Sequence, residues 1–316
     1  MEKPEYSLDP LFGSHGNKGS DAPPVYPPLA FGRFIVEREV GRGRNSVVYR
    51  AVDPADQAAV ALKVLYPSAE QNTLELRAQA VQKEAERLRL LNHPHIVGVR
   101  EAGIADGHAY IAFPFVRGLS LERALSGGTL ERPVALAFMI QVTLAVQHAH
   151  EQSLIHRDLK PGNILVGKRG DPYVLDFGLS WKLGSKSDYG VQSIVGTPAY
   201  MSPEQARGEE EHLTPATDVY GLGAILYEIL TGRPPFAADS AWRTVQLALS
   251  TPPVPPRQIS SAIDLGWEHI VLWCLEKEPG KRYPTCTALV EDLRLAAAGK
   301  PPQGPRAPGL LGRIFK

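Results

Sequence analysis

The sequence changes character at Leu119, and this change constrains the fold more than any other feature. Before Leu119 the chain contains short β-branched or aromatic runs separated by Gly, Asp-Pro and Asp-Gly turn signals, a pattern typical of strands. One stretch, 74–91, instead has apolar residues at helical spacing, and helical spacing predominates after Leu119. The sequence therefore predicts an α+β protein in which a small sheet-rich lobe precedes a larger helical lobe. A cleft between two such lobes is a natural ligand site.

The same patterns place the individual elements. Strands are expected at 34–40, 47–52, 58–64 and 109–115. Beyond Leu119, helices are expected at 134–152, 217–231, 241–249, 263–275 and 285–297.

Composition limits the class of protein. Of the 316 residues, 43% are hydrophobic and 22% are charged, which is a globular composition and excludes global disorder. The 34 basic residues balance 34 acidic ones, so we expect no nucleic-acid partner. The two cysteines, Cys274 and Cys286, cannot form a disulfide framework, and we interpret them as core thiols of a cytoplasmic protein. We expect neither a signal peptide nor a membrane-spanning segment, which needs about 20 apolar residues.

Half of the 28 prolines lie in three segments, 1–30, 252–256 and 298–316. Segments rich in Pro and Gly bury too little apolar surface to offset the entropy lost on ordering. We therefore expect a disordered Pro-rich tail over 1–30 and a basic Pro/Gly-rich tail over 298–316, with the folded unit between them. The segment 252–256 is expected to be a rigid loop because helical patterns flank it.

The run 41–49, Gly-Arg-Gly-Arg-Asn-Ser-Val-Val-Tyr, joins two predicted strands. Gly41 and Gly43 let the backbone approach phosphate groups closely, so that N–H groups can point at an anion. A hairpin that merely turns explains the same glycines. Ser46 stands where such loops usually carry a third glycine, so we expect a stiffer loop.

Lys63 ends an apolar run, Val-Ala-Leu-Lys, where an unpaired ammonium would be costly. The helix predicted at 74–91 offers Glu84 and Glu86 as anionic partners. A lysine that extends from the strand end into solvent is the alternative interpretation.

The strongest signal comes from 156–163, His-Arg-Asp-Leu-Lys-Pro-Gly-Asn, and from 176–178, Asp-Phe-Gly. One carboxylate at these places can accept a hydroxyl proton, while the other carboxylate and the amide can hold Mg²⁺, which prefers hard oxygen ligands. Either string alone could be a turn or a surface patch. Their order and spacing after the glycine loop and Lys63 make chance a poor explanation.

On these motifs the segment Phe34–Ala297 resembles the eukaryotic-like Ser/Thr protein kinases, and 200–208 is most similar to their bacterial branch. Further matching segments are 196–200, 202–204, 218–223 and Arg282, with Ser202 in place of the usual alanine. The resemblance implies a bilobal protein kinase domain over 34–297, with ATP bound between the lobes.

The resemblance also implies roles for the residues of the motifs. The implied catalytic residues are Asp158 as base, Lys160 as partner of the transferred phosphate, and Lys63, on the α- and β-phosphates, paired with Glu84. The implied Mg²⁺ ligands are Asn163 and Asp176.

The ATP site follows from the same resemblance. Phe113, at the gatekeeper position, is expected to close the back of the pocket to bulky ligands. Pro114 lacks an N–H and would offer only its carbonyl to adenine, whereas Val116 would offer both N–H and carbonyl. The implied nucleotide-binding residues are Val40, Gly41, Arg42, Gly43, Ser46, Val48, Ala61, Lys63, Phe113, Pro114 and Val116.

Three residues are implied to support the helical lobe. Glu204 and Arg282 carry opposite charges that are expected to be buried together, so that losing one would strand the other. Asp218, at a helix start, is expected to accept N–H groups of the catalytic loop. The alternatives are a simple N-cap role for Asp218 and a surface position for Arg282.

The implied activation-loop residues are Ser185, Ser187, Ser193 and Thr197. Thr197 is expected to bond Asp158 and Lys160, which excludes it as the main switch. A phosphate on one of the serines, first of all Ser193, could pair with Arg157 and order the loop. We therefore expect autophosphorylation in trans, through transient self-association.

Three functions fit these observations. The first is an active ATP- and Mg²⁺-dependent Ser/Thr kinase that acts on protein substrates in signalling. The second is a pseudokinase that keeps the fold as a binding module, which only Ser46 favours. The third is a small-molecule phosphotransferase, which Arg157, the Lys-Pro pair at 160–161 and the expected peptide-docking segment 196–204 disfavour. We expect the first.

Overall fold

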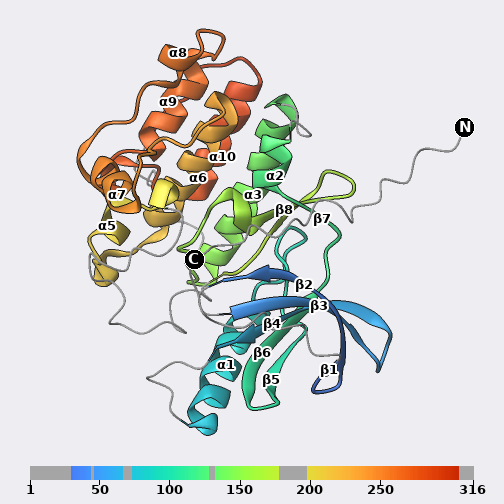
Figure 1. The fold of residues 1–316 in the computed structure, drawn as a ribbon. Coiled ribbons are helices and arrows are strands. Elements are labelled where there is room, and N and C mark those ends of the chain that lie inside the picture. The colour runs from blue at the N-terminus through green and yellow to red at the C-terminus, as the bar shows by residue number, and fades with distance from the viewer. Residues whose placement is uncertain (1–29, 44–45, 67–72, 128–131, 178–197, 306–316) are drawn as a thin grey trace, which may run out of the picture.

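The structure, a computed structural model, describes residues 30–43, 46–66, 73–127, 132–177 and 198–305. It has two lobes, a curved sheet with one helix and a larger group of helices (Figure 1). This arrangement confirms the bilobal α+β architecture that the sequence predicts.

The smaller lobe is an antiparallel sheet in the order β1-β2-β3-β4-β6-β5. Side chains along β3 alternate between a buried and a less buried face, as expected for a strand with one covered face. The strands are β1 (Ala30–Phe31), β2 (Phe34–Arg42), β3 (Ser46–Asp53), β4 (Ala58–Leu65), β5 (Glu101–Ala105) and β6 (His108–Pro114). The four predicted strands are present as β2, β3, β4 and β6. β5 was missed because its sequence, Glu-Ala-Gly-Ile-Ala, contains a single β-branched residue.

Helix α1 (Leu74–Arg89) packs against this sheet. Val81, Ala85 and Leu88 recur at helical spacing and are buried in the core. Glu84 lies among them in the sequence and is buried too, so this acid belongs to the covered face of the helix.

The larger lobe is built around α6 (Pro215–Thr231), most of whose residues are buried. Proline at its first position and Gly232, with a φ of 77°, at its end explain where this helix begins and ends. The other α-helices are α2 (Leu121–Ser126), α3 (Arg132–Glu151), α5 (Pro203–Ala206), α7 (Ala241–Ser250), α8 (Pro256–Ile259), α9 (Leu265–Cys274) and α10 (Cys286–Ala297). The predicted helices beyond Leu119 correspond to α3, α6, α7, α9 and α10. Among the described residues, none of the helices combines the length and the apolar character needed to span a bilayer.

A second, three-stranded sheet connects the lobes. Its antiparallel strands are β7 (Gly118–Ser120), β8 (Ile164–Gly167) and β9 (Pro172–Val174). The N–H of Val174 donates to the carbonyl of His95 at 2.8 Å, and the N–H of Val97 donates to the carbonyl of Val174 at 3.1 Å. These bonds fix β9, and with it Asp176 two residues further on, against the smaller lobe.

The folded unit is longer than the sequence predicts at both ends. Ala30 belongs to β1, and 298–305, predicted as the start of a tail, packs onto the larger lobe. The N–H groups of Gln303 and Gly304 both donate to the buried carboxylate of Asp292, each at 2.8 Å. Composition could not reveal that 298–305 is ordered. It indicates how much apolar surface a segment can bury, whereas this segment is held by specific hydrogen bonds. The remaining parts of both predicted tails lie outside the described residues.

Candidate active site

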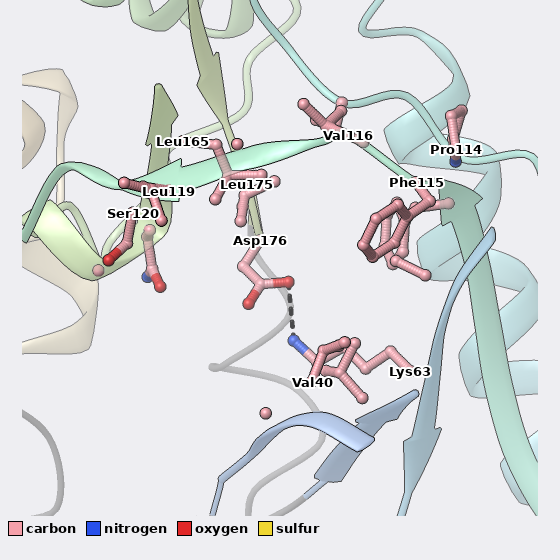
Figure 2. A pocket seen from close by; sticks show the side chains of 18 of the residues that line it. Val40, Lys63, Pro114, Phe115, Val116, Leu119, Ser120, Leu165, Leu175 and Asp176 are labelled. Atoms are coloured by element: carbon pink, nitrogen blue, oxygen red, sulfur yellow. Dashed lines mark hydrogen bonds and ion pairs between the residues drawn. The ribbon is translucent and has the colours of Figure 1, made fainter. Parts of the chain in front are cut away.

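A pocket of about 360 Å³ lies between the lobes and is lined by residues of both (Figure 2). This volume is typical of small-molecule sites. The predicted nucleotide-binding residues that line it are Val40, Gly41, Val48, Ala61, Lys63, Phe113, Pro114 and Val116. The two predicted metal ligands, Asn163 and Asp176, line it as well.

Apolar side chains form two opposite walls of the pocket. Figure 2 shows Val40 on one side and Leu165 with Leu175 on the other. Such walls suit a flat ring, because apolar contact on both faces removes it from water. Leu165 and Leu175 were missed by the sequence reasoning, although each lies within two residues of a predicted metal ligand.

The end of β6 and the residues that follow it form one edge of the pocket. Phe113 pairs with Ala61 across the β4–β6 ladder, is buried and lines the pocket. Pro114 and Val116 follow at the open edge.

Lys63 forms an ion pair with Asp176, with 2.8 Å between Nζ and Oδ1 (Figure 2). Burial alone would raise the pKa of the Asp176 carboxyl, but the Lys63 ammonium outweighs this effect and the pKa lies below its ordinary value. The pairing of Lys63 with Glu84 that the resemblance implied is not the one observed. Asp176, whose φ is 59°, meets Lys63 with its carboxylate, and Glu84 is buried on α1.

A second group of polar side chains surrounds Asp158. Lys160 Nζ lies 2.8 Å and 3.1 Å from the two carboxylate oxygens of Asp158. The Asn163 amide nitrogen donates to the Asp158 carboxylate at 2.8 Å and to its backbone carbonyl at 2.7 Å. The carboxylate is one-third exposed and can therefore be reached from outside.

Asp218 holds the backbone of the catalytic loop, which is the segment 156–163. Its two oxygens accept the N–H groups of His156 at 2.8 Å and Arg157 at 2.9 Å, as the sequence led us to expect. Arg157 has a φ of 68°, a left-handed conformation that costs a non-glycine residue on the order of 1–3 kcal/mol and persists only where neighbours enforce it. Asp218 is such a neighbour.

Glu204 and Arg282 are both buried and form a two-pronged ion pair, at 2.8 Å and 2.9 Å. The remaining guanidinium donors bond backbone carbonyls, among them that of Ala216 at 2.8 Å. Thr217 donates its hydroxyl to Glu204 at 2.9 Å. A fully satisfied pair of this kind ties α5 to α6 and to the segment before α10.

Gln205 joins this region to the catalytic loop, and the sequence reasoning missed it. Its side-chain oxygen accepts the Ser202 N–H at 3.1 Å in a capping box, and its amide nitrogen donates to the Arg157 carbonyl at 2.5 Å. The pattern Ser-Pro-Glu-Gln is a capping-box signal that was present in the sequence.

Three of the predicted nucleotide-binding residues at the glycine loop do not line the pocket. They are Arg42, Gly43 and Ser46. The Gly43 N–H donates to the Ser46 carbonyl at 2.8 Å, which closes the hairpin. The Arg42 guanidinium bonds Glu39 and the Tyr66 hydroxyl and is not among the residues that line the pocket. The predicted activation-loop residues Ser185, Ser187, Ser193 and Thr197 lie outside the described residues.

Asn163 and Asp176 suit a magnesium ion. Both hydrogen bonds that the Asn163 side chain makes within the described residues use its nitrogen, which leaves its oxygen for a cation. Mg²⁺ is commonly bound by one or two protein oxygens together with waters and substrate phosphates. The described part of the chain contains no group of three or more His, Cys, Asp or Glu side chains that could hold a metal ion.

The family model of the protein kinase domain matches residues 34–293. The chain therefore belongs to the protein kinase family. It is similar to the serine/threonine-protein kinases PknB of Mycobacterium leprae, with 34% identity over 89% of this chain and 45% of the relative, and PrkC of Bacillus subtilis, with 34% identity over 84% and 40%. The chain thus spans less than half the length of these relatives.

The fold is also similar to that of a solved structure, the PknI kinase domain of Mycobacterium tuberculosis. The TM-score is 0.65 and the identity 24%, over 85% of this chain and 97% of that domain. This likeness agrees with the bilobal fold described above.

Proposed function

We propose that this chain transfers the terminal phosphate of ATP to serine and threonine hydroxyls of proteins, with Mg²⁺ as cofactor. The observation that carries the proposal is the meeting of two polar groups beside one pocket: Lys63 with Asp176, and Asp158 with Lys160 and Asn163. The family and the names of its bacterial relatives support this reaction.

Asp158 would accept the proton of the attacking hydroxyl. The hydrogen bonds from Lys160 and Asn163 orient its carboxylate, so an incoming hydroxyl meets a base that is already in position. The Lys160 ammonium would also compensate negative charge on the transferred phosphate. Mg²⁺, held by Asn163 and Asp176, would neutralise the phosphate oxygens.

Lys63 would bind the α- and β-phosphates. Adenine would lie between the apolar walls formed by Val40 and Leu165. The Pro114 carbonyl and the backbone of Val116 would bond its edge, and Phe113 would close the back of the pocket to bulky ligands.

Regulation by autophosphorylation belongs to the same proposal. A phosphate on Ser185, Ser187 or Ser193 would add about −1.5 to −2 charges, which could pair with Arg157 and order the loop. The reaction would occur in trans, through transient self-association. A triple Ser→Ala variant at these positions that stays as active as untreated and phosphatase-treated wild type would contradict this regulation.

The proposed activity is tested by incubating the pure chain with radiolabelled ATP, Mg²⁺ and protein substrates, and mapping phosphosites by mass spectrometry. We expect label on serine and threonine. Asp158→Ala should lower the rate by about 10²–10⁴-fold with ATP affinity nearly unchanged, because Asp158 does not line the pocket. The exposed acid Asp239 provides the matched control, Asp239→Ala. A wild-type chain that binds ATP but transfers no label would instead indicate a pseudokinase.

A further inference from the structure

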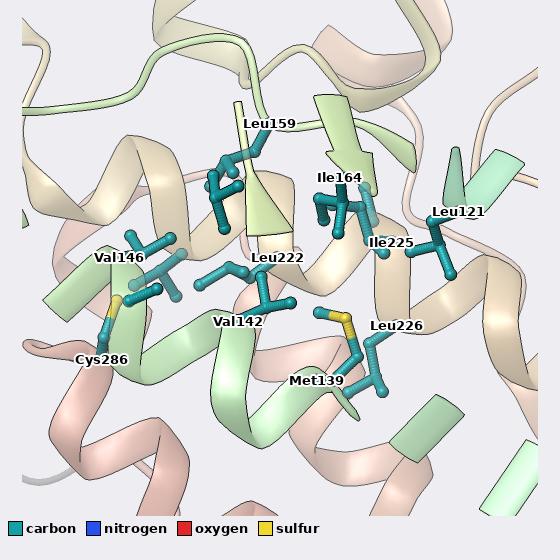
Figure 3. Packing of buried hydrophobic residues seen from close by; sticks show 14 of the residues in the cluster. Leu121, Met139, Val142, Val146, Leu159, Ile164, Leu222, Ile225, Leu226 and Cys286 are labelled. Carbon is teal, nitrogen blue, oxygen red and sulfur yellow. The ribbon is translucent and has the colours of Figure 1, made fainter. Parts of the chain in front are cut away.

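A buried chain of three side chains leads from α10 to the catalytic loop. Cys286, the first residue of α10, has its sulfur 3.7 Å from Nδ1 of His150 on α3. Nε2 of the same imidazole lies 2.8 Å from Asp218 Oδ2. Cys286 is fully buried, and the side chains of His150 and Asp218 are 5% and 1% exposed. Figure 3 shows Cys286 in the buried cluster that also holds Leu159 of the catalytic loop.

We propose that Cys286 is a positioning residue: its thiol donates a hydrogen bond to His150 and holds this imidazole in the tautomer that donates to Asp218. The proposal rests on the proposed kinase function, because Asp218 in turn holds the backbone beside Asp158.

The charge states of the three groups determine the direction of each hydrogen bond. Burial alone would raise the pKa of Asp218, but the hydrogen bonds from His150 and Arg157 outweigh it, so the carboxylate is ionised and accepts. Its position in the first turn of α6 favours the same negative charge. His150 must therefore carry hydrogen on Nε2. Burial raises the pKa of the Cys286 thiol well above its ordinary value, so the sulfur keeps its proton and can donate it to Nδ1.

The position of Asp218 matters because it enforces a strained backbone. Its oxygens already accept N–H groups from His156 and Arg157, and Arg157, with a φ of 68°, directly precedes Asp158. A His150 ring that turned or changed tautomer would remove one of the three donors that fix this carboxylate. The hydrogen bond from Cys286 prevents this change of the His150 ring, although Cys286 contacts neither the pocket nor a substrate.

The second cysteine is a matched control. Cys274, on α9, is also fully buried and lies against Gly223 of α6. Its thiol makes no hydrogen bond within the described residues. Replacing either cysteine by alanine removes the same atoms from the same core, so both variants should lose comparable stability. Only Cys286→Ala should remove the donor to His150.

Infrared spectroscopy of the whole chain tests the hydrogen bond directly, because Cys274 and Cys286 are its only thiols. We expect two S–H stretching bands, of which the lower in frequency disappears in Cys286→Ala and the higher in Cys274→Ala. Nitrogen-15 NMR of labelled histidine, assigned with His150→Gln, should show an unprotonated Nδ1 in the wild type. Two coincident bands, or a His150 ring protonated on both nitrogens, would overturn the proposal.

Kinetics test the consequence for catalysis. Cys286→Ala should lower kcat roughly threefold to tenfold, the effect of one net hydrogen bond, with KM for ATP unchanged. Cys286→Ser, which restores a donor, should recover most of kcat, and Cys274→Ala should leave kcat unchanged. Equal losses in both alanine variants would show that the sulfur acts by packing alone. If the wild type transfers no phosphate, the proposed function fails, whereas the spectra still decide whether the thiol fixes His150.

Discussion

The Lys63 ammonium pairs with the carboxylate of Asp176, 113 residues further along the chain, at 2.8 Å. This ion pair crosses the pocket and joins β4 of the smaller lobe to the segment after β9. The two side chains are 12% and 33% exposed, so water and salt screen the pair in part. Its importance therefore lies in the position that it gives to the carboxylate more than in stability.

Asp176→Asn should raise the half-saturating Mg²⁺ concentration of phosphate transfer by roughly tenfold or more, since the change removes a charged oxygen ligand. The measurement is a titration of activity against Mg²⁺ at saturating ATP. Asp171→Asn, in the turn between β8 and β9, is the control and should leave the half-saturation point where it is. An unchanged value in Asp176→Asn would exclude this carboxylate as a metal ligand.

The buried pair of Glu204 and Arg282 predicts a large and non-additive effect on stability. Either Glu204→Ala or Arg282→Ala should cost about 3–5 kcal/mol in the free energy of unfolding, because each leaves an uncompensated buried charge. The double variant should lose clearly less than the sum of the two single changes. Urea unfolding of all four proteins checks this, and strict additivity would show that the charges do not depend on each other.

The same pair predicts how stability responds to acid. Burial alone would raise the pKa of Glu204, but Arg282 outweighs it and the pKa lies below its ordinary value. The unfolded chain therefore binds this proton more readily than the folded one. The stabilisation is complete above the unfolded pKa of about 4.3 and is lost as pH falls through the folded value.

Melting temperatures measured between neutral pH and pH 3 test this dependence. Glu204→Gln should start lower and decline less steeply than the wild type. Glu278→Gln, which changes an exposed acid on the surface, should keep the wild-type slope. Equal slopes in all three proteins would contradict the assigned role of Glu204.

Ordered motifs allowed some distant partners to be predicted from the sequence. Glu204 and Arg282 are 78 residues apart, yet each belongs to a recognisable segment, so their opposite charges could be paired in advance. The same reasoning placed Asp218 against the backbone of the catalytic loop. The two lobes followed from the change in periodicity at Leu119.

Other features depend on geometry that no spacing contains. The sequence offered Glu84 and Glu86 as partners of Lys63, whereas in the structure Lys63 meets Asp176, whose φ is 59°. Gln205 sits in a visible capping box, but the reach of its amide to the Arg157 carbonyl is a tertiary contact. Cys286 and His150 meet only because α10 packs against α3.

The segment 298–305 provides the last prediction, because composition alone assigned it to a tail. Asp292 accepts the N–H groups of Gln303 and Gly304 as well as the hydroxyl of Tyr283, at 2.7 Å. Asp292→Ala would leave these three donors without their acceptor, and an unsatisfied buried donor costs about 1–3 kcal/mol. We therefore expect a loss of several kcal/mol in the free energy of unfolding.

Truncation and two neighbouring substitutions distinguish the effect of the hydrogen bonds to Asp292 from that of general packing. A chain ending at residue 305 should unfold in urea like the full chain, whereas one ending at 299 should be less stable. Gln303→Ala keeps its N–H and should be nearly neutral. Gly304→Ala should destabilise, because its φ is 82° and a Cβ there would lie 3.1 Å from the Trp273 ring. If the chain ending at 299 is as stable as the one ending at 305, the segment contributes nothing, and the boundary predicted from composition is the better one.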